Sequence, residues 1–211
     1  MEALTQYSCE DFAAALASRE AVPGGGGASA LAGALGMALG NMVGSLTAGK
    51  KKYAAVEADI QALNTRAEAL RRRLLGLVQA DAEAFAPLAR AYGLPRATPE
   101  EQTRKAAVME QALHAACRTP LEILRVTGQA LELIEQYAAK GSALAISDAG
   151  VAAALCRGAM QGAALNVYIN TRAMADRTHA AACERETDAL LAQYIPLADR
   201  VYEQVTARLR K

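Results

Sequence analysis

One carboxylate stands where the sequence pattern calls for an apolar side chain. Small or apolar residues recur every three or four positions from Tyr53 onward, as they do on the buried side of a long helix. The same spacing places Asp81 at the next position of that row, ahead of Phe85 and Leu88. Such a carboxylate can have a structural explanation, which is an ion pair or an exposed helix end. Alternatively, burial raises its pKa and the group can transfer protons in catalysis. The sequence leaves both interpretations open.

A second row combines small residues with amides. Its members follow one another at steps of four, on one face of an expected helix: Gly158, Gly162, Asn166 and Asn170. Buried amides need hydrogen-bond partners, and either a neighbouring helix or a heteroaromatic ligand can supply them. Asp148 lies at the expected start of the same helix, where capping is the simplest explanation for an acid.

The segment from Ala21 to Gly49 has no charged residue and is followed by Lys50, Lys51 and Lys52. Its length and its G-x-x-x-G spacing fit a membrane span. However, a proline and four glycines open it, and the remaining helices are amphipathic and need a partner. The residues from Gly44 to Lys51 also resemble the phosphate-loop motif G-x-x-x-x-G-K. However, Lys51 replaces the Ser or Thr that binds magnesium in that motif, and no strand is expected before the segment. We expect neither a membrane span nor a nucleotide loop.

The same segment has two different sides when it is drawn as a helix. One side carries Gly33, Gly36, Gly40 and Gly44, and the other carries Leu31, Leu35, Leu39, Met42 and Leu46. This pattern predicts a helix that is buried on both sides. Each glycine costs a helix about 1 kcal/mol relative to alanine, so the bare side favours close approach of another helix or of a flat ligand. The three lysines fit a solvated helix entry or an anionic ligand.

Composition narrows the functional classes. With 211 residues, the chain can form one domain, 1–211, with a substantial core. A net charge of +1, 4% aromatic residues and no tryptophan argue against a nucleic-acid partner. Four scattered cysteines and two distant histidines favour reduced thiols and no metal site. The first residues are acidic and polar, so we expect no signal peptide and a cytoplasmic protein.

Abundant Ala, Leu, Glu and Arg, without alternating polarity, predict an all-α bundle of about five to six helices, two of them long. Ser8, Thr98 and Ser147 mark expected helix starts, and prolines predict a kink near Pro87 and a bend at Pro120. The expected helices cover about residues 8–19, 28–47, 51–92, 98–139, 147–170 or beyond, and 186–209. The boundary between the last two stays open.

Several motifs in order resemble the cyclodeaminase half of formiminotransferase-cyclodeaminase, a family that also contains stand-alone bacterial methenyltetrahydrofolate cyclohydrolases. They are the Pro23–Gly26 turn, the helix 30–36, Gly49–Tyr53, Lys140–Gly141, Ser147–Gly150 and Asn166–Asn170. The resemblance covers nearly the whole chain. It implies an all-helical homodimer that binds a folate derivative, polyglutamylated or not, with no cofactor beyond the tetrahydrofolate substrate, no metal, no nucleic acid and no membrane.

The resemblance also implies roles for individual residues. Asp81 and Asp148 match positions expected to transfer protons as a carboxylate pair. The expected substrate-binding residues are Pro23, Gly24, Gly25, Gly26, Lys50, Lys51, Lys52, Asn166 and Asn170, with the lysines facing the glutamate tail. Gly27 replaces a frequent serine, and Ser142 and Leu144 replace expected asparagines.

Two reactions fit this resemblance, and both pass through a tetrahedral carbon between two folate nitrogens. We predict first a 5,10-methenyltetrahydrofolate cyclohydrolase, which opens the methenyl bridge to 10-formyltetrahydrofolate. This choice rests on the absence of a transferase domain from the sequence and on the loop at Ser142–Leu144. The alternatives are a 5-formiminotetrahydrofolate cyclodeaminase that releases ammonia, and a non-catalytic helical dimer that binds folate or a partner.

Overall fold

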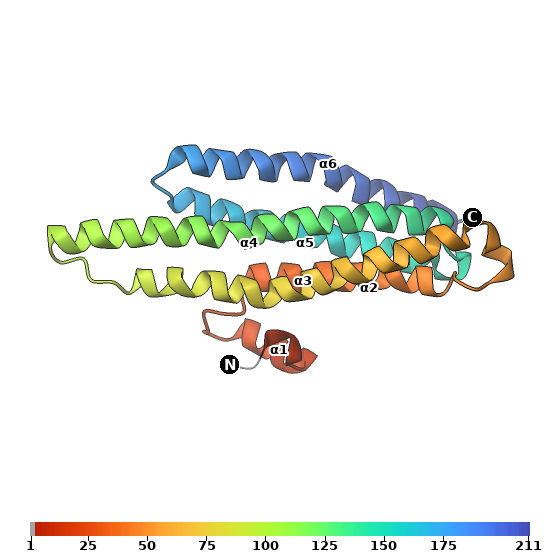
Figure 1. The fold of residues 1–211 in the computed structure, drawn as a ribbon, viewed down its shortest axis with the longest axis horizontal. Coiled ribbons are helices and arrows are strands. Elements are labelled where there is room, and N and C mark those ends of the chain that lie inside the picture. Colours follow the sequence, from red (N-terminus) through yellow and green to blue (C-terminus); the bar gives the residue numbers. More distant parts are fainter. Residues whose placement is uncertain (1–2) are drawn as a thin grey trace.

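Long helices pack side by side along most of the chain in the computed structural model, which describes residues 3–211 (Figure 1). These residues form six α-helices and three short 3-10 helices, with no strand among them. The α-helices are α1 (Cys9–Ala17), α2 (Gly25–Ser45), α3 (Glu57–Tyr92), α4 (Pro99–Lys140), α5 (Ile146–Ala173) and α6 (Arg177–Leu209). The 3-10 helices are Leu4–Gln6, Lys51–Val56 and Ala143–Ala145. The predicted all-α class is confirmed for this part of the chain.

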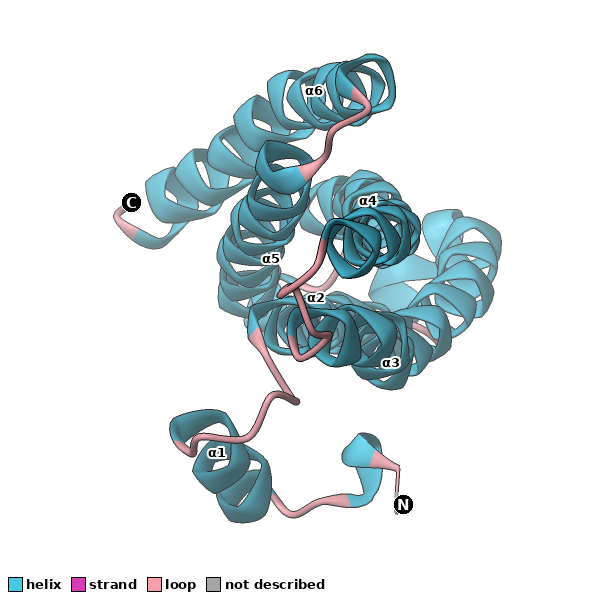
Figure 2. Ribbon diagram, turned by 90° about the vertical axis from the view of Figure 1, so that its left-hand side faces the viewer, coloured by secondary structure: helices cyan, strands magenta, loops and turns pink. Residues whose placement is uncertain are grey.

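The bundle is built around α2 and α5. Helix α2 packs against α3, α4 and α5, and α6 packs against α4 and α5. Helix α1 lies to one side of the bundle, as the view in Figure 2 shows, and Phe12 is its one buried residue. The core therefore lies among α2 to α6.

Capping side chains fix the helix starts that the sequence marked. The Ser8 side chain accepts a hydrogen bond from the Asp11 N–H, and Thr98 and Glu101 form a complete capping box at the start of α4. Helix α1 ends at Ala17 rather than Arg19, because the backbone of Ser18 is already extended. The boundary between α5 and α6, which the sequence left open, lies at 174–176. There the Asp176 side chain caps α6 by accepting a hydrogen bond from the His179 N–H.

Three expected boundaries were wrong. Helix α6 begins at Arg177, nine residues before the expected start at 186. The predicted loop glycines Gly25, Gly26 and Gly27 form the first turn of α2, so the helix begins three residues before Ala28. The long helix expected from Lys51 begins at Glu57, because the intervening residues adopt a 3-10 helix with a non-helical Tyr53. Pro87 and Pro120 both lie inside their helices.

The two sides of α2 have different surroundings. The side with the four glycines is buried, and a side chain at any of them would meet atoms of α3, α4 or α5. Close helix packing therefore explains this side. The opposite side was predicted to be buried as well, but within this chain Leu35, Met42 and Leu46 are 52%, 39% and 45% exposed. In the single chain that prediction was therefore wrong for these three residues, whereas Leu31 and Leu39 are partly buried against the core.

Two helical segments, Gly25–Ser45 and Ala143–Ala173, are long and apolar enough to cross a membrane by length and composition alone. About half of each is buried inside the bundle, 56% and 50% of the most apolar window. Their apolar character therefore agrees with core helices, which pass the same test.

Candidate functional site

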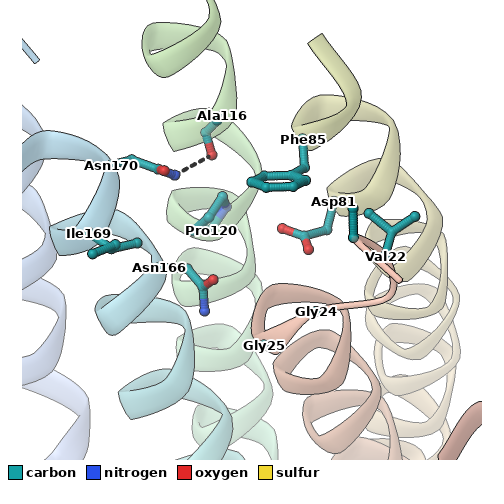
Figure 3. Close-up of a pocket in the computed structure, with 11 residues that line it drawn as sticks. Val22, Gly24, Gly25, Asp81, Phe85, Ala116, Pro120, Asn166, Ile169 and Asn170 are labelled. Carbon is teal, nitrogen blue, oxygen red and sulfur yellow. Dashed lines mark hydrogen bonds between the residues drawn. The ribbon is translucent and has the colours of Figure 1, made fainter. Parts of the chain in front are cut away.

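A cavity of about 240 Å³ opens where α2 begins, between α3, α4 and α5. Figure 3 shows the side chains around it. Its lining comes from the segment before α2 and from all four helices: Ala21, Val22, Gly24, Gly25, Asp81, Phe85, Ala116, Pro120, Asn166, Ile169 and Asn170. Asp81 is the one charged residue in this lining. A site with one carboxylate, two amides and apolar walls suits a flat heteroaromatic ligand that carries positive charge or N–H donors.

Asp81 reaches the cavity from the middle of α3 and is partly buried. Burial raises the pKa of its carboxyl group, and a hydrogen bond from the backbone N–H of Gly27 opposes that rise in part. Within residues 3–211, no Lys, Arg or His forms an ion pair with it. Of the two interpretations of Asp81 that the sequence left open, this environment agrees with a proton-transferring carboxyl group.

Asn166 and Asn170 face the cavity from the last turns of α5 (Figure 3). The amide nitrogen of Asn166 donates to the Gly162 carbonyl oxygen at 2.9 Å, and that of Asn170 donates to the Ala116 carbonyl oxygen at 3.3 Å. Each amide nitrogen keeps a second N–H donor, and each side-chain oxygen remains available as an acceptor. Together with the Asp81 carboxylate, these oxygens give the cavity several acceptors, which suits a ligand with N–H donors.

The predicted glycine turn divides into two parts. Gly24 and Gly25 line the cavity, whereas Pro23 and Gly26 are buried behind it. Gly26 lies against the carboxylate of Asp81, so its place is beside the acid rather than in the cavity wall.

The apolar walls of the cavity were not predicted from the sequence as part of a site. Phe85 lies one turn after Asp81, Ile169 lies between the two asparagines, and Pro120 comes from α4. The spacing of Phe85 and Ile169 from the polar residues was a usable signal, because residues three or four apart share a helix face. For Pro120 and for Val22 the sequence held no such signal.

The other predicted site residues lie far from this cavity within one chain. Asp148 is in the first turn of α5, and the eighteen residues from there to Asn166 span about 27 Å of helix. Lys50, Lys51 and Lys52 follow the opposite end of α2 and are exposed. One chain therefore does not bring Asp81 and Asp148 together, and their expected pairing stays a prediction for the homodimer.

No group of three His, Cys, Asp or Glu side chains in the described part of the chain could hold a metal ion. The four cysteines are free thiols. Burial raises the pKa of the Cys117 and Cys156 thiols to about 12, which makes both poor nucleophiles.

Known proteins resemble the chain in both sequence and structure. A family model described as formiminotransferase-cyclodeaminase matches residues 8–189. The chain is 44% identical over 200 residues to a methenyltetrahydrofolate cyclohydrolase of Methylorubrum extorquens, covering 95% of this chain and 96% of that protein. It is 34% identical over 175 residues to the formimidoyltransferase-cyclodeaminase of Mus musculus, covering 83% of this chain but 32% of the mouse protein. A crystal structure of formiminotetrahydrofolate cyclodeaminase from Thermotoga maritima superposes with a TM-score of 0.86 at 28% identity, covering 98% of this chain and 99% of that one.

Proposed function

The chain belongs to the formiminotransferase-cyclodeaminase family, and we propose that it is a 5,10-methenyltetrahydrofolate cyclohydrolase. The reaction adds water to the cationic methenyl bridge and yields 10-formyltetrahydrofolate. The observation that carries the proposal is the partly buried carboxyl group of Asp81, which is the one charge in the lining of the cavity. Similarity over nearly the full length of a protein with this activity supports the choice of reaction.

A single carboxyl group can perform the proton transfers of this reaction. As a carboxylate, Asp81 stabilises the methenyl cation and accepts a proton from water while the oxygen–carbon bond forms. The protonated acid then returns this proton to N5 as the bond between N5 and the bridging carbon breaks. The hydroxyl proton of the resulting formyl group leaves to solvent, so the reaction releases one proton overall. A raised pKa suits both steps, because the group must accept and donate near neutral pH.

The remaining cavity residues fit the pterin end of folate. The acceptor oxygens of Asn166 and Asn170 suit the N–H groups of the pterin ring, and Phe85 offers an aromatic face. No cationic side chain lines the cavity, so the anionic glutamate tail extends out of it. The proposed reaction needs no metal and no cofactor beyond the tetrahydrofolate substrate.

A homodimer would bring the distant predicted residues to the cavity. Helices α2 and α5 pack against each other and both expose apolar side chains, which on α5 include Leu165 at 67% and Ile169 at 62% exposure. Ile169 also lines the cavity, so a second copy on this face would cover the cavity rim. In an antiparallel two-fold arrangement, the end of α2 in one copy lies beside its start in the other. Lys50, Lys51 and Lys52 of a second copy then approach the folate tail, polyglutamylated or not, and its Asp148 approaches the cavity.

The four free thiols agree with a reducing compartment, and we place the enzyme in the cytoplasm. The alternative activity is the 5-formiminotetrahydrofolate cyclodeaminase reaction, because the solved cyclodeaminase from Thermotoga maritima has the same fold. A second alternative, which is not an enzyme, is a helical dimer that binds folate without turnover.

The loss of the ultraviolet band of methenyltetrahydrofolate tests the proposal directly. We expect purified protein to accelerate this loss well above buffer hydrolysis, with no metal added. Asp81→Asn should retain folate binding and lower the rate by about 10²–10⁴-fold, the usual contribution of one general acid–base group. No acceleration by the wild-type protein would rule out the cyclohydrolase. Release of ammonia from formiminotetrahydrofolate would identify the cyclodeaminase, and binding without either reaction would identify the non-catalytic dimer.

A further inference from the structure

The first turn of α2 consists of glycines that lie beside polar side chains of other helices. Gly25, Gly26 and Gly27 are its first three residues, and their backbone N–H groups have no acceptor inside the helix. A Cβ atom at Gly26 would lie 2.5 Å from Cγ and 2.6 Å from Oδ2 of Asp81, and closer still to Oδ1. Any side chain at Gly26 would therefore occupy the space of the Asp81 carboxylate.

We infer that Gly26 is a positioning residue that acts through Asp81, because its missing side chain lets the carboxylate lie against the start of α2. There the carboxylate accepts the Gly27 N–H and faces the positive end of the helix dipole. These interactions hold a buried acid in place without a cationic side chain. The kinetic consequences of this inference rest on the proposed cyclohydrolase function, whereas its steric basis does not.

No other charged residue lines the cavity, so the start of α2 is the main electrostatic neighbour of Asp81. Gly24 and Gly25 at the start of α2 line the cavity, together with Ala116 and Pro120 of α4 and with Asn166, Ile169 and Asn170 of α5. The segment before α2 adds Ala21 and Val22, and Phe85 shares α3 with the acid. None of these residues titrates. A displacement of the carboxylate from Gly27 should therefore change its proton affinity directly.

Neighbouring glycines in the same turn tolerate a methyl group to different degrees. A Cβ atom at Gly25 would lie 3.2 Å from Nδ2 of Asn166, a tight contact that a small side-chain shift relieves. At Gly27 the nearest atom would be the Val78 carbonyl oxygen at 3.5 Å, an ordinary contact, and at Gly24 no atom lies within 4 Å. Alanine at Gly26 is thus the substitution that conflicts with the acid, and alanine at Gly25 affects Asn166.

The first test of this inference needs no activity. Gly26→Ala should destabilise the wild-type protein but cost little in an Asp81→Ala background, because the shortened side chain frees the space that the new methyl group needs. Unfolding of the two single variants and the double variant measures this coupling. If the two substitutions add independently, the inference is wrong, whether or not the protein is a cyclohydrolase. If Gly26→Ala alone does not fold, recovery of folding in the double variant provides the same answer.

The second test measures the pH profile of kcat/KM for methenyltetrahydrofolate hydrolysis. We expect Gly26→Ala to lose about 10²-fold in kcat/KM, as for other small misplacements of a catalytic group. Its acidic limb should move to higher pH, since the displaced carboxylate loses the Gly27 N–H that stabilises its charged form. Gly25→Ala should raise KM without moving the limb.

A glycine-to-alanine control is available on the same helix as the acid. Gly76 lies on the exposed side of α3, and a methyl group added there would meet no atom within 4 Å. Gly76→Ala should therefore keep both the rate of the wild-type enzyme and the acidic limb of its pH profile. A Gly26→Ala enzyme with the wild-type acidic limb would overturn the positioning role. An inactive wild-type protein would instead overturn the proposed function and leave the coupling measurement valid.

Discussion

Asp81 combines a proposed functional role with a cost in stability. Its carboxyl group is desolvated and its charged form receives a hydrogen bond from one backbone N–H. A buried carboxylate with so little compensation destabilises the folded chain at neutral pH. Such a residue indicates function, because an apolar or amide side chain in the same place would favour folding.

Stability measurements on Asp81→Asn should reveal this cost. The pKa of Asp81 in the folded chain lies above its usual value of 3.8. At a pH between the usual pKa and the raised pKa, the folded state therefore binds more protons than the unfolded state. Stability therefore falls as pH rises through this window and stays lower above it. The amide oxygen of the substituted side chain can still accept the Gly27 N–H. We expect Asp81→Asn to melt a few degrees above wild type at pH 7, where about 1 kcal/mol corresponds to roughly 2–4 °C for a chain of this size.

The stability difference should disappear below the usual pKa of 3.8, where both side chains are neutral. Thermal unfolding of the two proteins at pH 7 and at low pH provides the comparison. A variant that is less stable than wild type at neutral pH would contradict the account of Asp81 as a poorly compensated buried charge.

At the scale of elements, the glycines of α2 are explained by contact with other helices. Near its end, Asn64 of α3 accepts hydrogen bonds from Asn41 at 3.1 Å and from the Tyr137 hydroxyl at 2.8 Å. A Cβ atom at Gly44 would lie 2.5 Å from Cε1 of Tyr137 and closer still to Oδ1 of Asn64. The glycine therefore provides the space for a polar network that joins three helices.

Gly44→Ala should destabilise the bundle by about 2 kcal/mol, since overpacking a filled core usually costs about 1–3 kcal/mol. Gly76→Ala is its matched control, because its methyl group meets no atom within 4 Å and alanine favours an exposed helix by about 1 kcal/mol. Chemical denaturation of both variants measures the two changes. Equal effects of the two substitutions would mean that close approach does not explain the glycine side of α2.

At the scale of the whole molecule, α2 and α5 pack against each other and both expose apolar side chains, one of which, Ile169 of α5, lines the cavity. A chain with this surface and a ligand site at its edge is suited to a two-fold dimer in which each copy covers the other's cavity. Such an arrangement would explain why predicted site residues lie at both ends of α2.

Leu165→Glu should convert the proposed dimer to a monomer, because it places a charge on the apolar surface of α5. Light scattering coupled to size-exclusion chromatography measures the mass, and the hydrolysis assay shows whether activity falls with it. Leu209→Glu is a matched control, since Leu209 is similarly exposed, at 60%, near the end of α6. A wild-type protein that is monomeric and fully active would contradict this proposal.

The sequence by itself determined the helices and the polar residues that line the cavity. Helical periodicity and local caps depend on residues three or four apart, so Ser8, Thr98 and the row that includes Asp81 could be interpreted without a structure. The sequence also predicted that Asn166 and Asn170 lie on the same helix face, because they are four residues apart. These predictions all concern contacts within a single element.

Only the tertiary structure decided which of these residues meet. It placed Asp81 beside Gly26 and near the two asparagines, and it separated Asp81 from Asp148 by most of the length of α5. It also turned Gly25–Gly27 from an expected loop into the start of a helix. The physical reason is that contacts between helices depend on how whole faces pack, and side chains distant in sequence set that packing together.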